Sequence, residues 1–291
     1  MATAVTQGWS GTPLKRVAMK PFVVQAATPL GEAIATLQDP QAHCLLVADA
    51  GGTLRGVFTE EDVLNKILGR PLPAGLTVGD FTEKEAYSIG EEATVGEALD
   101  MMGEKRLKYL PVCNRKRHPV GVLSVRWLMD FIADAFPANG AIPSEPDGVL
   151  EKDLTTVIRL PMSFVLTSQG HLDCLKLSHD EAIAAASLRF KGADHGAALV
   201  FEDGTLAGLL RVRDIPFKVL HRDHSAEHLP VMDFMTKVPE SVRESETLQA
   251  AIHKIAKTGI LFLVYSAGEN YGLVSARDIV AYIYSHIHDD E

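Results

Sequence analysis

The residues of this chain best suited to chemistry lie in two short strings in which a hydroxyl precedes an acid by three positions. Thr59 and Asp62 form the first string, and Ser275 and Asp278 form the second. This spacing is typical of a helix start, where both side chains can bond backbone N–H groups of the first turn. The N–H groups at a helix start can also bind an anionic ligand. Two interpretations therefore stay open for both strings, a helix cap alone or a contact to a ligand.

Arginines accompany these strings. Arg277 directly precedes Asp278, and Arg213 directly precedes Asp214 in a third string whose hydroxyl position holds Arg211. A cation in the first turn of a helix is mildly unfavourable, because it lies at the positive end of the helix dipole. The position of the arginines therefore favours a phosphate contact about as much as a solvated surface.

A cluster of histidines resembles a metal site, but its surroundings argue against one. The cluster consists of His221, His224, Glu227 and His228, a spacing that could place metal ligands on one helix face. Pro230 follows at once, so a solvated linker is the favoured interpretation. The chain contains no G-x-S-x-G, P-loop or H-E-x-x-H motif, and we therefore expect neither enzymatic activity nor an obligatory cofactor.

The strings belong to a segment that recurs four times along the chain. The copies are Gly56–Val63, Gly121–Leu128, Gly208–Ile215 and Gly272–Ile279. Their glycines are 65, 87 and 64 residues apart, and the longer middle interval contains the proline-rich run Pro137–Asp147. The repeats therefore form two pairs, the first with the second and the third with the fourth.

Each repeat shows the same predicted order of elements, which places its string between the last strand and the closing helix. An extended stretch comes first, followed by a helix, a buried strand and a hairpin. The predicted helix starts are Thr28–Pro29, Thr94, Ser178 and Thr247. The predicted buried strands are Cys44–Val47, Tyr109–Val112, Ala198–Phe201 and Leu261–Tyr265. We predict a mixed α/β fold of four tandem βαββα repeats arranged as two paired modules.

The predicted boundaries follow from the same pattern. They are an N-terminal extension at 1–16, repeats at 17–70 and 71–136, a linker at 137–151, repeats at 152–222 and 223–285, and a tail at 286–291.

Composition restricts the class of protein. The chain has 291 residues, of which 46% are hydrophobic and 23% charged, a balance that can bury a large core. The net charge of −10 gives no overall attraction to nucleic acid or anionic lipid. Its three cysteines form no C-x-x-C motif, and no apolar run approaches the roughly 20 residues of a membrane helix. We expect a soluble cytoplasmic protein with neither nucleic acid nor membrane as a partner.

With these motifs in hand, the chain resembles the cystathionine-β-synthase-type (CBS) domain family. The resemblance covers nearly everything from Val17 to Ser285, and its string is G-h-h-[ST]-x-x-D, where h is hydrophobic. It implies that the repeats pair into two modules. These two modules could stack as a pseudo-fourfold disc. The second copy departs from the string, because Trp127 stands where the acid is expected, although Ser124 and Arg126 are present.

The resemblance also implies a ligand and the residues that would bind it. Clefts between paired repeats in the family take adenosine ligands, so AMP, ADP, ATP or S-adenosylmethionine is expected here. The acid of the string would bind ribose hydroxyls, and the hydroxyl and the basic residues would contact phosphate. The implied nucleotide-binding residues are Thr59, Asp62, Arg211, Arg213, Asp214, Ser275, Arg277 and Asp278.

The expected function is that of a stand-alone regulatory protein that senses an adenine nucleotide and modulates a partner protein in trans. Such a protein could also act through self-association as a homodimer. The alternative is a scaffold or interaction module whose clefts no longer bind nucleotide, which the missing acid of the second copy would favour. Binding of adenylate to one to three sites per chain would separate these two functions.

Overall fold

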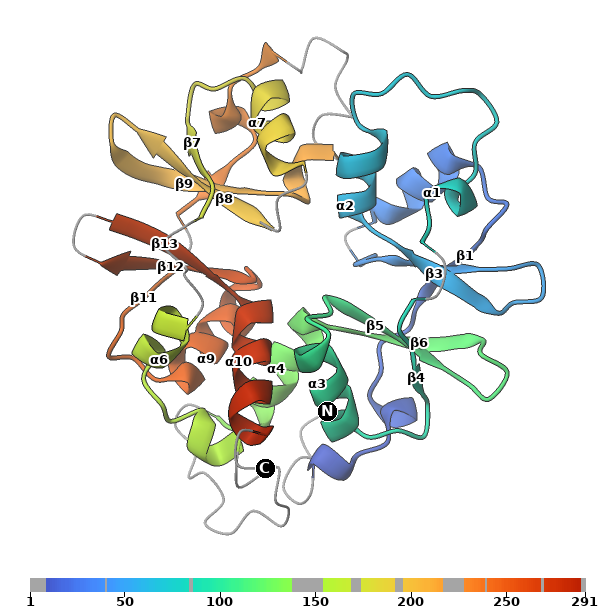
Figure 1. Ribbon diagram of the computed structural model, residues 1–291, viewed down its shortest axis with the longest axis horizontal. Helices are drawn as coiled ribbons and strands as arrows, with labels where there is room; N and C mark the ends of the chain where they lie inside the picture. Colours follow the sequence, from blue (N-terminus) through green and yellow to red (C-terminus); the bar gives the residue numbers. More distant parts are fainter. Residues whose placement is uncertain are drawn as a thin grey trace.

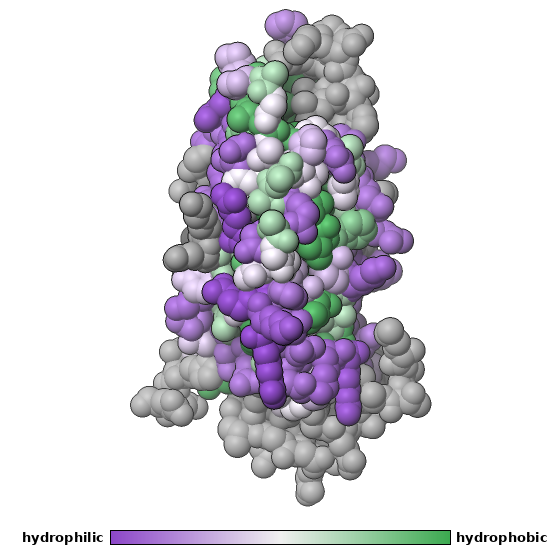
Figure 2. Space-filling view, turned by 90° about the vertical axis from the view of Figure 1, so that its right-hand side faces the viewer, coloured by the Kyte–Doolittle hydropathy of each residue, from purple (hydrophilic) through white to green (hydrophobic). Residues whose placement is uncertain are grey.

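The computed structural model describes residues 9–39, 41–83, 86–137, 154–168, 174–191, 196–216, 228–238, 240–267 and 270–288. Four small sheets surround the centre of the molecule (Figure 1). The two sheets of each pair face each other, and helices lie between the two pairs. Viewed from the edge, the molecule is thinner than it is wide, so the four units form a flattened disc (Figure 2). The mixed α/β fold predicted from the sequence is confirmed.

Each sheet is built on the same three strands. The first strand runs parallel to the second, and the second pairs antiparallel with the third. The second strand is the central one and is covered on both faces, which explains its continuous apolar run; Leu45–Ala48 is buried at every position. The first three strands are β1 (Phe22–Gln25), β2 (Leu45–Ala48) and β3 (Leu54–Phe58). The second sheet contains β4 (Ile89–Gly90), β5 (Tyr109–Cys113) and β6 (Pro119–Ser124).

The other two sheets repeat this pattern in the second half of the chain. The third sheet adds a short strand at its edge, where β10 pairs with β9. Its strands are β7 (Lys176–Ser178), β8 (Ala197–Glu202), β9 (Thr205–Arg211) and β10 (Thr236–Lys237). The fourth sheet contains β11 (Ser241–Val242), β12 (Phe262–Ala267) and β13 (Asn270–Ser275).

Helices connect the first strand of each sheet to the second and close each unit. The connecting helices are α1 (Leu30–Leu37), α3 (Val95–Glu104), α7 (Ile183–Phe190) and α9 (Leu248–Thr258). The helices that follow the third strand are α2 (Glu60–Asp62), continued by a π-helical turn η3 (Val63–Ile67), α4 (Val125–Ala135) and α10 (Ala276–His288). Further helices of the described residues include α6 (Met162–Ser168) and the 3₁₀ turns η1 (Trp9–Gly11), η2 (Leu14–Arg16), η4 (Val78–Asp80) and η6 (Val231–Asp233).

Three of the four predicted helix starts are correct. The hydroxyls of Thr94 and Thr247 accept hydrogen bonds from the third residue of α3 and α9, at 3.3 and 3.2 Å. The predicted start at Thr28–Pro29 is also correct in position, because α1 begins directly after Pro29. The prediction at Ser178 is wrong, because Ser178 ends β7 and the residue before α7 is Ala182. Neither alanine nor proline carries a side-chain oxygen, so these two starts have no side-chain cap.

Exchanged segments join the repeats in pairs. The segment that precedes the first strand of each repeat packs against the other repeat of its pair. It contacts the residues just before the connecting helix of that repeat. The backbone hydrogen bonds of this exchange include Leu14 N to Ala93 O (2.8 Å), Val78 N to Thr28 O (3.0 Å), Met162 N to Glu246 O (2.7 Å) and Val231 N to Glu181 O (2.8 Å). Residues in the expected N-terminal extension therefore pack against the second repeat, while the exact repeat boundaries remain predictions.

The core is divided unequally. One continuous cluster joins the second and fourth repeats through α3, α4, α9 and α10, whereas the first and third repeats have separate clusters. Two smaller clusters lie between the paired sheets, one in each module.

The structure addresses three of the expectations only in part: the linker, the histidine cluster and the absence of a membrane helix. Most of the predicted linker, 138–151, and most of the histidine cluster, 221–227, lie outside the described residues. Within the described ranges, no group of three or more potential ligands could hold a metal ion. No helix in the same ranges is long and apolar enough to cross a membrane.

Candidate functional site

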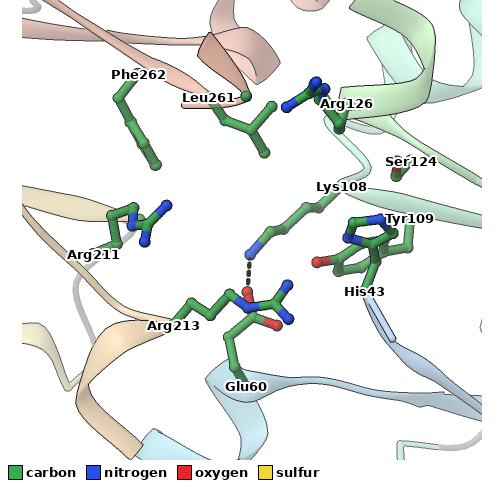
Figure 3. Close-up of a pocket in the computed structure, with 13 residues that line it drawn as sticks. His43, Glu60, Lys108, Tyr109, Ser124, Arg126, Arg211, Arg213, Leu261 and Phe262 are labelled. Carbon is green, nitrogen blue, oxygen red and sulfur yellow. Dashed lines mark hydrogen bonds and ion pairs between the residues drawn. The ribbon is translucent and has the colours of Figure 1, made fainter. Parts of the chain in front are cut away.

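A cavity lies at the centre of the disc, where all four repeats meet. It has a volume of about 140 Å³. Four basic side chains reach it, two from the second repeat and two from the third (Figure 3). The lining residues are His43, Glu60, Lys108, Tyr109, Ser124, Val125, Arg126, Gly196, Arg211, Arg213, Gly259, Leu261 and Phe262. A cluster of cations in a partly enclosed cavity attracts an anion, because the attraction is less screened there than on an open surface.

The acid of the cavity is paired with one of its cations. Glu60, the first residue of α2, forms an ion pair with Lys108, which directly precedes β5 (Figure 3). The Glu60 side chain is only 4% exposed, and that of Lys108 is 26% exposed. Burial by itself would lower the pKa of Lys108, but the carboxylate of Glu60, together with Tyr109 and Glu61, raises it above its ordinary value. Lys108 is therefore a cation at every physiological pH.

Arg126 is held by two elements of different modules. Its Nε donates to both carboxylate oxygens of Asp130, at 3.0 and 2.9 Å, and its Nη2 donates to the carbonyl of Ala256 at 3.2 Å. Gly259 ends α9 with φ of 73°, and a Cβ at this position would lie 2.4 Å from Nη1 of Arg126. Only glycine can both adopt this backbone conformation easily and leave room for the guanidinium.

The third repeat supplies the other two arginines. Arg211 donates to both oxygens of Asp214, at 2.8 and 2.9 Å, in the bidentate geometry that suits a guanidinium and a carboxylate. Arg213 lines the cavity and donates to the carbonyl of Ala42 in the first repeat at 3.4 Å. The first and third repeats therefore meet at an arginine of the cavity.

Two further side chains of the wall are uncharged at neutral pH. Burial, followed by the charges of Arg213 and Arg126, lowers the pKa of His43. Burial, followed by the negative charge of Glu60, raises the pKa of the Tyr109 hydroxyl. The neutral imidazole and the protonated phenol can each donate a hydrogen bond to an anion.

A second cleft lies between the paired first and second repeats. Its volume is about 680 Å³, within the range of small-molecule sites. The segment that leads into β1 forms one wall, and Cys44 and Val122 contribute apolar surface. Burial raises the pKa of the Cys44 thiol to about 12, so this thiol adds no charge to the cleft. The lining residues are Met19, Lys20, Pro21, Phe22, Val23, Gln41, His43, Cys44 and Val122. His43 lines both this cleft and the central cavity.

The structure brings only part of the predicted site together. Arg211 and Arg213 line the central cavity, whereas the three acids and Thr59, Ser275 and Arg277 line neither cavity. Asp62 and Asp278 close capping boxes: each accepts from the backbone N–H and the hydroxyl of the residue three positions earlier, at 2.6–2.9 Å. The cap that the sequence pattern suggested is present in both strings, and a ligand contact of these residues stays a prediction.

Each of the three acids also forms an ion pair. Asp62 pairs with Lys66 at 2.8 Å, and Asp214 pairs with Arg211. Asp278 pairs at 2.7 Å with Arg106, which belongs to the other module.

Sequence reasoning did not select His43, Glu60, Lys108 or Tyr109. Lys108 directly precedes a predicted strand and Glu60 is one of two adjacent acids, and neither position differs in the sequence from an ordinary surface charge. Arg126 was visible as the basic residue of the second copy, and together with the predicted Arg211 and Arg213 it is a sequence signal that points to the cavity.

The chain is a tandem-repeat α/β protein, in which exchanged segments join the repeats in pairs around a central cavity. The family model of the CBS domain matches residues 14–69, 78–134 and 231–285, more than half of the chain. The chain belongs to the CBS domain family, as its resemblance implied. The matched family gives no indication of a catalytic activity.

Curated relatives support the family over most of the chain. CBS domain-containing protein CBSCBSPB5 of Arabidopsis thaliana is 25% identical over 252 residues, covering 80% of this chain and 46% of the relative. CBSCBSPB1 of the same plant is 23% identical over 279 residues, covering 90% and 51%. The chain thus spans about half the length of the curated relatives that it matches.

Solved structures show the same fold at low sequence identity. Protein MJ1225 of Methanocaldococcus jannaschii matches with a TM-score of 0.73 at 14% identity, covering 93% of this chain and 99% of its own. An uncharacterized conserved protein of Pyrococcus horikoshii matches with a TM-score of 0.57 at 15% identity, covering 94% and 100%.

Proposed function

We propose that the chain is a regulatory unit that binds an adenine nucleotide and modulates a partner protein. The adenosine part occupies the cleft between the first and second repeats, and the phosphate occupies the central cavity. The segment 152–222 acts as a fourth CBS repeat in this proposal, because β7, α7, β8 and β9 follow the same order as the elements of the matched repeats.

The observation that carries this proposal is the position of His43, which lines both spaces. The two spaces therefore adjoin at His43, and in this proposal one ligand reaches from the cleft into the cavity beside this side chain. The apolar wall of the cleft suits a flat base, and the basic side chains of the cavity suit a phosphate. The predicted ligand residues Arg211 and Arg213 take the phosphate role in this arrangement. Lys108 and Arg126 join them in that role.

Regulation follows from the composition of the cavity. Lys108 and Arg126 belong to the first module, and Arg211 and Arg213 belong to the second. A phosphate between them favours the arrangement in which the two modules bring these cations together. A ligand shifts such an equilibrium by the difference between its affinities for the two arrangements, and a partner that contacts both modules would detect the shift.

Isothermal titration calorimetry with adenosine, AMP, ADP, ATP, S-adenosylmethionine and orthophosphate tests the proposal. Val23 lines the cleft and is 44% exposed, so Val23→Asp should weaken adenosine and AMP about ten-fold and leave orthophosphate unchanged. Val120 is 43% exposed and lines neither space, and Val120→Asp is the matched control. Arg213→Gln should weaken AMP and orthophosphate about ten-fold and leave adenosine unchanged.

The scaffold function rests on a different observation. Asp62, Asp214 and Asp278 each accept hydrogen bonds or ion pairs from side chains of the protein itself. A protein whose motif acids have become structural would bind no ribose through them. Absence of binding by every adenosine ligand, with a folded protein, would establish this alternative.

A further inference from the structure

The central cavity contains one feature that opposes the binding of an anion. Glu60 is the only acidic residue among the described residues that line the cavity. Its side chain is 4% exposed, so water screens its charge poorly. In the close-up, its carboxylate faces the ammonium group of Lys108 (Figure 3). A ligand phosphate would therefore enter a space that already holds a carboxylate.

The other acids near the cavity differ from Glu60 in position. Asp130 and Asp214 bind the guanidinium groups of Arg126 and Arg211, but neither acid lines the cavity. Each of these acids orients an arginine without presenting its own charge to the cavity. Glu60 alone among the three both neutralises a cation of the cavity and repels an incoming anion.

Repulsion of this kind depends on the charge of the ligand. The Coulomb energy between Glu60 and the anion grows in proportion to the charge that the anion brings into the cavity. An anion can gain the full attraction of Lys108 only by competing with Glu60 for its ammonium group. A single phosphate dianion meets the smallest repulsion, and each additional phosphate of a polyphosphate chain adds to it.

We propose that Glu60 limits the charge of the ligand, so that the site takes a monophosphate, such as AMP, and discriminates against di- and triphosphates. The inference rests on the proposed nucleotide site and names the nucleotide class that this site selects. The other charged side chains of the cavity are cations, which attract a ligand more strongly the more negative it is. Glu60 opposes this trend and therefore acts as a specificity-determining residue.

Inorganic phosphates test the inference without the adenosine cleft. Calorimetry in magnesium-free buffer at constant ionic strength gives Kd for orthophosphate, pyrophosphate and tripolyphosphate. For the wild type, we expect orthophosphate to bind with the lowest Kd and tripolyphosphate to bind at least about ten-fold more weakly. For Glu60→Gln, we expect tripolyphosphate to gain at least about ten-fold in affinity relative to orthophosphate, because the repulsive charge is gone and Lys108 is released.

Glu61 offers a matched control on the same lysine. Its carboxylate lies 3.3 Å from Nζ of Lys108, but its side chain is 42% exposed and does not line the cavity. Glu61→Gln should therefore leave the ratio of affinities within about two-fold of the wild type. Glu60→Asp keeps the charge and should keep most of the discrimination. An equal effect of Glu60→Gln and Glu61→Gln, or loss of discrimination in Glu60→Asp, would overturn the inference.

The remaining outcomes are also decisive. Circular dichroism and melting temperature establish whether Glu60→Gln folds. If it does not, the wild type alone decides, and a Kd for tripolyphosphate equal to or below that for orthophosphate overturns the inference. Absence of phosphate binding to both the wild type and Glu60→Gln overturns it as well. Discrimination among inorganic phosphates without any binding of AMP contradicts the nucleotide function alone, whereas binding of AMP without discrimination contradicts the role of Glu60 alone.

Discussion

The two modules of the disc meet at two junctions that differ in how they are held together. At the junction of the second and fourth repeats, α3 packs on α10 and α4 packs on α9 (Figure 1). Their buried side chains form one core without a boundary between the repeats. Gly103 of α3 lies so close to α10 that a Cβ would come within 2.3 Å of the Tyr284 Cβ.

The junction of the first and third repeats is smaller and more polar. Each of these repeats has its own core, and Leu64 and Leu68 are the side chains of the first repeat that reach the cluster of the third. Hydrogen bonds to backbone carbonyls add to the contact, from Lys191 to Leu68 at 2.9 Å and from Arg213 to Ala42 at 3.4 Å.

The difference indicates which junction a ligand can influence. Apolar burial between α3, α4, α9 and α10 is independent of any ligand and keeps one side of the disc closed. At the other side, Arg213 both lines the cavity and bonds the opposite repeat. A phosphate that binds Arg213 therefore acts directly on the smaller junction, and four variants or conditions test this contrast.

The largest effect is expected from Gly103→Ala at the helix-packed junction. The added methyl group cannot fit beside Tyr284 unless α3 and α10 move apart, because the nearest atom, a Cβ at 2.3 Å, belongs to the fixed base of the side chain. We expect a loss of about 3 kcal/mol in the free energy of unfolding, measured in urea. Gly31→Ala, in α1 with no atom within 4 Å of the added Cβ, is the control and should cost nothing. Equal midpoints for both variants would refute close packing at this junction.

A smaller loss is expected from Asp278→Ala, which removes a capping box and the ion pair with Arg106 across the same junction. We expect about 1–2 kcal/mol of destabilisation and an unchanged Kd for AMP, because Asp278 lines neither cavity. Asp80→Ala removes a similar capping box, formed with Thr77, for which the described residues show no ion pair to the other module. We expect a smaller loss in the free energy of unfolding from this variant. A fall in AMP affinity of about 5- to 150-fold at unchanged stability would instead make Asp278 a ribose ligand, as the family pattern implies.

Lys191→Met tests the smaller junction. The substitution keeps the apolar stem and removes the ammonium group that donates to Leu68. We expect a loss of about 1 kcal/mol or less, with faster hydrogen exchange confined to the helical turn of the first repeat. The effect should diminish when AMP is bound, because the ligand holds the same junction through Arg213. Equal exchange with and without AMP would show that the ligand does not act there.

The smallest effect concerns pH. The folded protein holds the pKa of His43 below its ordinary value, so the unfolded chain binds more protons near that value. The contribution of His43 to stability is therefore full above pH about 6.5 and is lost as pH falls below it. Denaturant unfolding between pH 5 and 8 measures how the free energy of unfolding changes with pH. His43→Gln should remove the part of this change that comes from His43. A slope that is the same in both proteins would show that His43 titrates normally.

The sequence predicted the local parts of this protein well. The fourfold string, its paired spacing and the apolar runs of the central strands were sufficient to predict the α/β repeats, and the spacing of Ser275 and Asp278 predicted a cap. These features depend on residues a few positions apart, whose geometry is set by the backbone of one strand or one helix turn. Ser178 was mistaken for a cap because a serine shortly before a helix fits the sequence pattern of a cap. The turn between Ser178 and α7 packs against the exchanged segment, which no local pattern predicts.

The central cavity depends on relations that no local pattern contains. Glu60 meets Lys108 across 48 positions, and Arg126 bonds Ala256 across 130. Glu60 and Lys108 have the sequence context of ordinary surface residues. The sequence by itself determined that four similar units would form and pair, because each unit has an apolar face to bury. Only the tertiary structure decided which charges converge, because convergence follows from packing four separate surfaces around one centre.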